Sequence, residues 1–290
     1  MRLNTSSVTL ATCVRSRPTT RRFELKPERT VIMTRVLLVL LVLSLTAIPP
    51  SAAADEAQTD ESSDVSEIIA TVNDGIPNLI HGDIVPNRKR NAASCTSSGC
   101  KWPKNGNYVY VPVSISSTYS RAQRSIIIRS LVSFHRSTCI RFVWRRWYHR
   151  SYLNFFSGSG CWSYVGRVGG AQPVSLRKNG CLYTSTVQHE VLHALGFHHE
   201  HVRSDRDSYV EILTQNIQSG RENNFQKAQT NNLGTPYDFG SVMQYSNNAF
   251  SKNGQPTIVA RKDPNLKFGN AKEMSTNDIA RINRLYKCRS

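Results

Sequence analysis

Residues 189–199, HEVLHALGFHH, contain side chains of the types and at the spacing that a catalytic zinc site needs. His189 and His193 are four residues apart, so on a helix they lie on one face, one turn from each other. At that separation two imidazole nitrogens can reach one ion at about 2.0–2.1 Å. Gly196 permits the positive-φ turn that ends a helix, and the reversal can bring His199 round as a third ligand. Three neutral nitrogens leave one coordination position for water, as in catalytic zinc sites.

Glu190 follows the first histidine and is the candidate general base. It can accept a proton as water attacks a carbonyl, and it can deliver that proton to the leaving amine. With the His, Glu and Gly frequencies of this chain, the pattern HExxHxxGxxH is expected by chance about once in 10⁵ such chains, so a histidine-rich surface helix is the weaker alternative. His198 and His201 lie beside this pattern, and we expect neither to bind the ion.

The elements that must hold these residues can be read from apolar periodicity. A helix is predicted over 184–195, and a second over 118–136, with Ile127, Leu131 and Phe134 on one face. Strands are predicted at 107–115, 139–144, 151–156 and 172–176. After Gly196 the chain is rich in loops until Ser275, where Ser-x-x-Asp caps a last helix. Helices and strands mix without strict alternation, which predicts an α+β fold.

The first 54 residues are predicted to lie outside the folded body. Residues 36–48, VLLVLLVLSLTAI, follow Arg35 and precede three alanines at 52–54. This run is too short to span a bilayer comfortably and has the order of a secretory signal peptide, with a buried core helix as the alternative. A signal that starts at Met33 occupies 33–54, which makes residues 1–32 an upstream extension or a mis-called start.

Charge divides the rest of the chain. Residues 55–90 contain eight acids and three bases, net −5, and end in Arg88-Lys89-Arg90. Residues 91–290 contain 26 Lys and Arg and ten Asp and Glu, net +16. Acidic segment, basic site and cysteine-bearing body follow the order of secretory processing, so 55–90 is predicted to be a propeptide; a solvated surface loop is the alternative. Its first part is expected to be weakly ordered.

Six cysteines remain when the extension that contains Cys13 is set aside. They are Cys95, Cys100, Cys139, Cys161, Cys181 and Cys288. An even number in a secreted chain indicates disulfides, but six cysteines allow about 15 pairings. No two of them have the CxxC spacing of a zinc ribbon.

The sequence around the histidines resembles the signature of the astacin metallopeptidases, a family of the metzincins. HEVLHALGFHHEHVRSDRD is similar to the family's zinc-binding stretch, and SVMQY at 241–245 is similar to its Met-turn. The resemblance covers about residues 76–288. It implies a two-lobed α+β catalytic domain over 91–290, with a twisted mixed sheet, an active-site helix, a Met-turn and a C-terminal helix. It also implies one Zn²⁺ per chain.

Several roles come only from this resemblance. Met243 would form an apolar floor under the zinc ligands, and Tyr245 would be an extra ligand that swings away and steadies the oxyanion. Glu200 would bind, through water, the N-terminus that processing frees at Asn91. Gln244 replaces the family's usual His, which is not a ligand, so we expect activity to survive.

The propeptide and the cysteines match the family as well. IHGD at 80–83 resembles the FxGD aspartate switch, with Ile80 in place of Phe, so Asp83 would bind zinc in the zymogen. His81 is the competing ligand, because imidazole also binds zinc well. The family pairing implies the disulfides Cys139–Cys288 and Cys161–Cys181. The extra pair Cys95–Cys100 marks a six-cysteine subgroup known from teleost fish, which includes egg-hatching enzymes.

Together these features predict a secreted zinc endopeptidase, made as a zymogen that is suited to storage in secretory granules. We expect a monomer that acts on protein substrates, with egg-envelope glycoproteins as the favoured class. A digestive, immune or reproductive-tissue astacin is the alternative. Intact Glu190 and Tyr245 argue against an inactive binding protein of the same fold. We expect no nucleic-acid partner, because the chain is predicted to be secreted and contains no nucleic-acid-binding motif. We also expect no stable membrane insertion.

Residues 144–149, WRRWYH, are unusually aromatic and basic. One interpretation is a solvated loop in which long cationic side chains lie over aromatic rings. The other is a loop that docks substrate.

Overall fold

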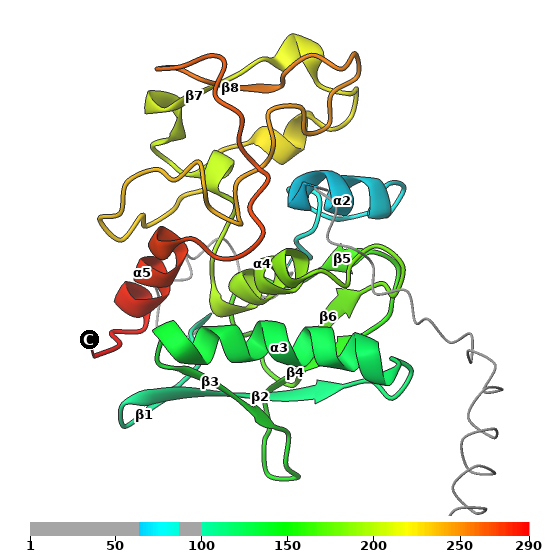
Figure 1. The fold of residues 1–290 in the computed structure, drawn as a ribbon, viewed down its shortest axis with the longest axis vertical. Coiled ribbons are helices and arrows are strands. Elements are labelled where there is room, and N and C mark those ends of the chain that lie inside the picture. Colours follow the sequence, from blue (N-terminus) through cyan, green and yellow to red (C-terminus); the bar gives the residue numbers. More distant parts are fainter. Residues whose placement is uncertain (1–63, 87–99, 290) are drawn as a thin grey trace, which may run out of the picture. The chain divides into compact units, whose positions relative to one another are not determined.

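The computed structural model describes residues 64–86 and 100–289 (Figure 1). The predicted extension, the signal peptide, residues 55–63 of the propeptide, the tribasic run, Asn91 and Cys95 lie outside the described residues. Within the described ranges, no helix has the length and apolar character needed to cross a membrane.

A mixed six-stranded sheet forms the base of the folded body. Its strands are β1 (Lys104–Asn105), β2 (Tyr108–Ile115), β3 (Ile140–Trp144), β4 (Tyr152–Phe156), β5 (Cys161–Trp162) and β6 (Ala171–Leu176). The order is β1-β2-β4-β6-β5, and β3 pairs with β2. The pairs β2–β3, β2–β4 and β4–β6 are parallel, whereas β1 and β5 run antiparallel to their neighbours. The four predicted strands lie within one residue of β2, β3, β4 and β6, and β5 is an end strand.

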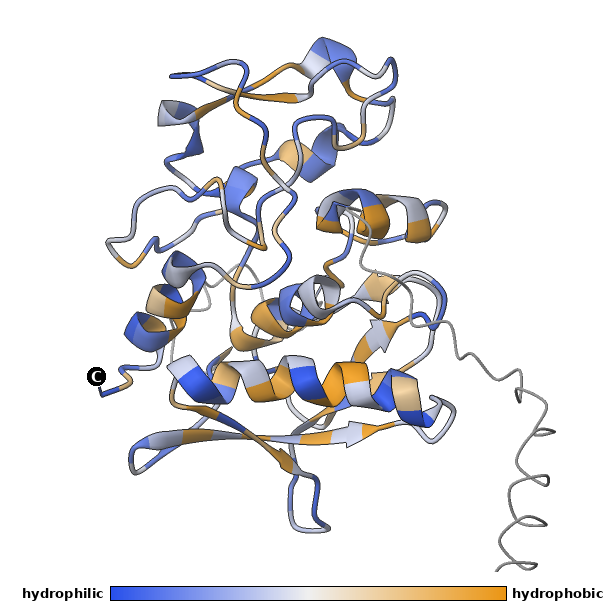
Figure 2. Ribbon diagram, in the orientation of Figure 1, coloured by the Kyte–Doolittle hydropathy of each residue, from blue (hydrophilic) through white to orange (hydrophobic). Residues whose placement is uncertain are grey.

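Two helices, α3 (Arg121–Ser137) and α4 (Thr184–Leu195), pack on this sheet and on each other. α3 begins at Ser120, whose side chain forms a capping box with Gln123. Its predicted face is confirmed, because Ile127, Leu131 and Phe134 are buried. Figure 2 shows hydrophobic residues along both helices and the strands, which together form the main core. The predicted α+β class is therefore confirmed.

The second half of the chain is mostly loop, as predicted. β7 (Val210–Ile212) and β8 (Ile258–Ala260) form a short antiparallel pair that no sequence pattern indicated. α5 (Thr276–Leu285) begins at Ser275 with the predicted capping box to Asp278. The structure contains disulfides at Cys139–Cys288, which joins the end of α5 to the start of β3, and at Cys161–Cys181, which joins β5 to the segment before α4.

Residues 64–86, part of the predicted propeptide, contribute a helix and a strand-like end to the same body. α2 (Val65–Val72) begins at Asp64, whose Oδ1 accepts a hydrogen bond from the Ser66 backbone N–H at 2.9 Å. Val65 and Ile69 of α2 are buried in the main core. Farther along, the Val85 N–H donates to the Ser163 carbonyl at 2.9 Å, and the Ser163 N–H donates to the Asp83 carbonyl at 3.0 Å. Residues 83–85 therefore pair with Ser163, directly after β5.

Candidate active site

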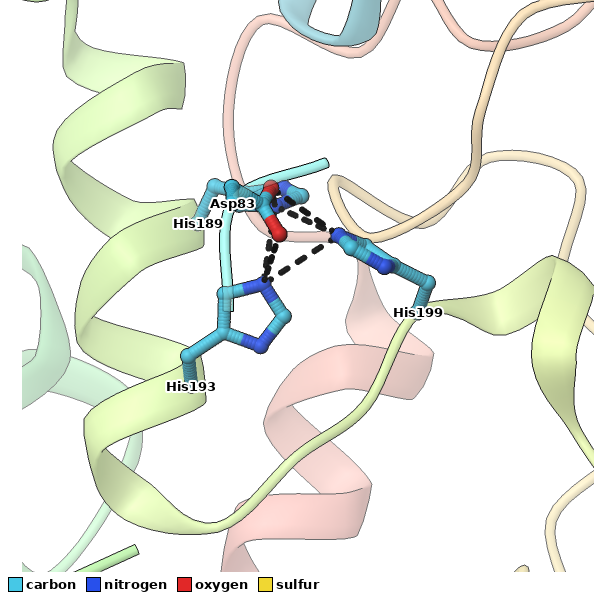
Figure 3. Close-up of side chains that lie close together, drawn as sticks. All are labelled: Asp83, His189, His193 and His199. Carbon is cyan, nitrogen blue, oxygen red and sulfur yellow. Dashed lines mark hydrogen bonds and ion pairs between the residues drawn. The ribbon is translucent and has the colours of Figure 1, made fainter. Parts of the chain in front are cut away.

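α4 and the turn after it bring three histidines together (Figure 3). His189 and His193 lie on one face of α4, which ends at Gly196 with a φ of 114°. A residue with a Cβ rarely adopts this conformation. The Gly196 N–H bonds to the carbonyls of Leu192 and His193, and the chain reverses so that His199 faces the helix. All three imidazoles are buried.

The Nε2 atoms of these imidazoles point to one spot. They lie 3.1 Å (His189 to His193), 3.1 Å (His189 to His199) and 3.2 Å (His193 to His199) apart. The Nδ1 atoms of His189 and His193 lie 2.9 and 2.7 Å from the carbonyl oxygens of Val242 and Phe197. Because a carbonyl only accepts, these Nδ1 atoms carry the protons and the Nε2 atoms carry lone pairs. Lone pairs this close repel each other unless a cation lies between them.

Asp83 completes a group of four side chains that could hold a metal ion. Its Oδ2 lies 3.0 Å from His189 Nε2 and 3.1 Å from His199 Nε2, and its Oδ1 lies 3.5 Å from His193 Nε2. The centre of a tetrahedron with edges of 3.1 Å lies about 1.9 Å from each corner, close to the distances at which zinc binds nitrogen and oxygen. These donors therefore fit Zn²⁺. His81 is not a member of the group, whose four residues are Asp83, His189, His193 and His199.

Burial and charge set the protonation states that such a group needs. Burial lowers the pKa of His193 and of His199, which keeps both imidazoles neutral and able to bind a metal. Burial on its own would raise the pKa of Asp83. When His199 and His193 are charged, their attraction outweighs burial and holds the pKa of Asp83 well below its ordinary value.

Glu190 lies buried beside this group. Neither of its carboxylate oxygens has a hydrogen-bond partner among the described residues. Burial, followed by the charge of Asp83, raises the pKa of Glu190 well above its ordinary value. A buried carboxylate without partners is costly to maintain, and such groups cluster at functional sites.

The segment 241–245 orients His189 through a backbone carbonyl. The Val242 carbonyl accepts the proton of His189 Nδ1, and Met243 is buried in the same core as α4. Ser241 Oγ donates to Asp278 Oδ1 at 2.6 Å, and the Val242 N–H donates to Asp278 Oδ2 at 3.0 Å. α5 therefore anchors the turn that fixes His189. The sequence indicated Asp278 only as a helix cap.

Tyr245 is buried between the histidines and the propeptide. Its ring stacks on His201 with centroids 4.0 Å apart and lies 4.6 Å from the His199 ring. Its hydroxyl donates to the carbonyl oxygen of His81. Gly82 follows with a φ of 84°, and a Cβ at this position would lie 2.8 Å from the Tyr245 hydroxyl oxygen. Both the backbone conformation and the close approach therefore require glycine.

Gln244 and His201 support this arrangement without joining the four ligands. Gln244 accepts a hydrogen bond from the Tyr237 hydroxyl at 2.6 Å and donates to the Tyr245 carbonyl at 2.8 Å. His201 Nε2 donates to the Asn224 carbonyl at 3.0 Å. These bonds hold the backbone of Tyr245 and the ring on which it stacks.

Glu200, next to the third histidine, is held by two arginines that the sequence did not indicate. Its buried carboxylate accepts from Arg281 Nη2 at 2.7 Å, from Arg203 Nη1 at 3.1 Å and from the Asp238 N–H at 2.7 Å. A second bond joins Arg281 Nη1 to the other oxygen. A cavity of about 60 Å³ adjoins this ion pair, and His198 is part of its wall.

Comparison with known proteins agrees with this geometry. Residues 96–287 match the family model described as Astacin, a peptidase family. Low choriolytic enzyme of Oryzias latipes is 42% identical over 238 residues, which are 81% of this chain and 88% of that protein. High choriolytic enzyme 1 of the same fish is 44% identical over 233 residues, 79% of this chain and 86% of that protein. The solved structure of that enzyme, described as a hatching enzyme zinc-protease, has a TM-score of 0.66 and 46% identity over 69% of this chain and 100% of its own.

Replacing Arg281 by Met should destabilise the uncut protein. The buried carboxylate of Glu200 then keeps one guanidinium instead of two, and we expect the free energy of unfolding to fall by about 2–4 kcal/mol. Arg261→Met is the control, because Arg261 pairs with Glu211 at 3.7 Å on the surface and its loss should cost less than about 1 kcal/mol. Urea denaturation compares the two variants. Equal loss of stability in both would contradict the role given to Arg281.

Proposed function

The chain belongs to the astacin family of zinc metalloendopeptidases, and from that premise we propose that it is a secreted zymogen whose activated form digests egg-envelope proteins. The proposal of a zymogen is supported by Asp83, a carboxylate of the proposed propeptide that lies among the three histidines. The envelope substrate is supported by the relatives, which are named as choriolytic and hatching enzymes. A digestive, immune or reproductive-tissue astacin is the alternative with the same chemistry.

Glu190 is the proposed general base. Zinc bound by His189, His193 and His199 supplies a Lewis acid that lowers the pKa of a water molecule and polarises the substrate carbonyl. Glu190 takes the proton of the attacking water at a carboxylate oxygen and then delivers it to the nitrogen of the leaving amine. Both of its oxygens lack partners among the described residues, so no competing bond has to break first.

Tyr245 is the proposed donor to the oxyanion. In the uncut chain its hydroxyl donates to the carbonyl of His81, a peptide carbonyl like that of a substrate. Removal of the propeptide frees this hydroxyl to donate to the oxygen on which negative charge develops. Met243, buried in the main core, is the proposed apolar floor under the histidines.

The proposed zymogen is kept inactive in two ways, by a propeptide ligand to the metal and by a segment that covers the substrate-binding edge. Asp83 takes the fourth ligand position, and residues 83–85 pair with Ser163 beside the end strand β5. An extended substrate would add to this same edge through main-chain hydrogen bonds. Asn73 fixes the covering segment, because its side-chain amide donates to the carbonyls of Gly82 at 2.9 Å and Cys161 at 2.6 Å. The propeptide would thus block both the reacting centre and the substrate edge.

Activation is proposed to begin at Arg88-Lys89-Arg90. Cleavage after Arg90 would free Asn91, whose α-amino group would bind Glu200 through water. The small cavity beside Glu200 supports this role, since it gives a cation room next to a buried carboxylate. Arg281 and Arg203 hold that carboxylate in place until the new N-terminus arrives.

The cellular setting follows from the processing pattern. The signal peptide at 33–54, preceded by the extension 1–32, would direct the chain into the secretory pathway, and the propeptide at 55–90 would keep the catalytic domain at 91–290 silent. Such a latent form suits storage in granules. We propose that the enzyme acts as a monomer.

Incubation of the activated protein with isolated egg envelopes and, separately, with casein tests the proposed substrate. Swelling or dissolution of the envelope supports a hatching enzyme. Cleavage of casein without any effect on the envelope favours the digestive, immune or reproductive alternative. A protein that binds the envelope and cuts neither material would overturn the catalytic assignment.

Glu190→Ala should retain zinc and lose turnover, because the base is removed while the three ligands remain. His193→Ala should instead lose the metal. Elemental analysis and cleavage of a protein substrate separate the two outcomes. A Glu190→Ala enzyme as fast as its parent would show that another group moves the proton.

Tyr245→Phe should lower kcat of the cut enzyme about 10²- to 10³-fold with little change in KM, as for loss of other oxyanion donors. Phenylalanine keeps the ring that stacks on His201 and His199. Tyr119→Phe is the matched control, since it also removes a buried hydroxyl, one that donates to the Leu176 carbonyl and touches neither Tyr245 nor the four ligands. A change confined to KM would rule out the proposed role of Tyr245.

Asp83→Ala should give an uncut protein with measurable peptidase activity, because the fourth ligand is lost. Gly82→Ala should also leak, since its Cβ would lie 2.8 Å from the Tyr245 hydroxyl. Gly75→Ala is the control: its φ of 75° imposes a similar backbone strain, but nothing lies within 4 Å of the added Cβ. Mass spectrometry checks that each chain is intact. If uncut Asp83→Ala is as silent as the parent, His81 or steric cover alone explains latency.

A further inference from the structure

The first half of the catalytic domain carries a positive charge that its own fold does not neutralise. Between Asp83 and Glu190 the chain contains no Asp or Glu, and residues 100–189 contain 13 Lys and Arg. Where the structure describes an ion pair of Lys or Arg, the base always lies in residues 203–281. By contrast, residues 190–290 contain 13 bases and ten acids. The excess charge of the first half is therefore available to an external anion.

This charge is combined with aromatic rings on the loop between β3 and β4. Residues 144–150, WRRWYHR, contain three arginines, all of them exposed. The exposed fractions of Trp144, Trp147 and Tyr148 are 52%, 91% and 60%. In Figure 1 this connection projects below the sheet, whereas α4 with its histidines lies on the other side of α3. Grouped exposed rings of this size mark an interaction surface.

Hydrogen bonds hold the loop in a defined shape. The Arg145 N–H donates to the Val113 carbonyl at 2.9 Å, the Arg146 N–H donates to His149 Nδ1 at 2.9 Å, and the His149 N–H donates to the Arg146 carbonyl at 3.1 Å. The guanidinium of Arg145 lies 4.4 Å from the centre of the Tyr152 ring. A loop that is already ordered loses little entropy when it binds a ligand.

A groove of about 710 Å³ runs beside this loop, between α3 and β3. Its walls include Tyr110, Leu131, His135, Phe142, Arg146 and Tyr148. The groove is thus apolar and aromatic inside and cationic at its rim. A ligand that suits it must offer both apolar faces and negative charges.

We propose that the loop 144–150 and this groove bind an anionic polysaccharide, sulfated or carboxylated. Sulfate and carboxylate groups match the planar fork of a guanidinium, and the C–H faces of sugar rings pack against aromatic rings, whose faces are electron-rich. Short segments rich in Lys and Arg are typical of heparin-binding patches. An acidic peptide would satisfy the arginines but would leave three exposed rings without a contact, so the polysaccharide is favoured.

This inference deepens the proposed function and depends on its extracellular setting. A glycan site on the far side of α3 from the histidines would hold the enzyme on a glycosylated matrix while its substrate edge at β5 stays open. Tethering of this kind raises the effective concentration of substrate at the active site. It leaves the chemistry of the bond cleavage unchanged.

Binding of the uncut protein to heparin, measured over a series of salt concentrations, tests the site. The variant with Arg145, Arg146 and Arg150 all replaced by Gln should bind at least about tenfold more weakly at 0.15 M salt, with a flatter dependence of log Kd on log salt. Trp147→Ser should weaken binding about three- to tenfold without any change of charge. The control replaces Lys252, Lys262 and Lys267, all exposed in the other half of the domain, by Gln. It also removes three charges, and we expect a change below about twofold.

Three results would overturn the proposal. One is an equal loss in the loop variant and the lysine control, which would show that net charge alone binds heparin. Another is tighter binding of poly-glutamate than of heparin, which would identify an acidic peptide as the ligand. The third is equally tight, loop-dependent binding of single-stranded DNA, which would identify a general polyanion site.

Cleavage of a short uncharged peptide by the cut enzyme keeps this test separate from the proposed function. The loop variants should retain parental kcat/KM on that peptide, because the loop is remote from the ligand group. A parent that binds heparin through the loop but cleaves nothing would refute the proposed enzyme and leave the glycan site standing. A parent that cleaves the peptide but does not bind heparin would refute the glycan site and leave the proposed enzyme standing.

Discussion

The Nε2 atoms of three imidazoles converge on one buried point, and the rest of the structure depends on that convergence. Separations of 3.1–3.2 Å between the Nε2 atoms are tolerable only with a cation between them. The carbonyls of Val242 and Phe197 fix the protons on the opposite side of two rings, so the backbone itself selects the tautomer that binds metal. The turn at Gly196 and the segment 241–245 are therefore placed by the geometry of the metal ligands as well as by core packing.

Residues 81–85 cover the same point. Asp83 adds a carboxylate where the three rings converge, and Gly82 lets the backbone approach Tyr245 closely enough to occupy its hydroxyl. Residues 83–85 complete the edge beside β5. In the proposed zymogen, a segment of a few residues would therefore cover a ligand position, the proposed oxyanion donor and the proposed substrate edge together, and a single cleavage would release all of them.

The parts of the site that were predictable from the sequence are local. His189, Glu190, His193, Gly196 and His199 lie within eleven residues, so one helix and one turn bring them together. The cap formed by Ser275 and Asp278 is local for the same reason. The bonds from Asp278 to the segment 241–242 span 36 and 37 residues, and the pair Glu200–Arg281 spans 81, so no periodicity encodes them. β7 and β8 escaped prediction because strands of three residues show no alternation. Asp83, Tyr245 and the disulfide pairs were accessible only through the family resemblance.

The acidic residues of this chain are unevenly distributed, and their distribution determines where the positive charge is left without a partner. Asp83, Glu190, Glu200 and Asp278 are buried at or beside the candidate site. Residues 100–189 contain no acid, so their 13 cations repel one another without a neutralising partner among them. Loss of the proposed propeptide, which carries −5, changes the net charge of residues 55–290 from +11 (the sum of −5 and +16) to +16 for 91–290. The cleavage that uncovers the metal ligands would thus also make the enzyme more cationic, so that activation and attachment to an anionic matrix would increase in one step.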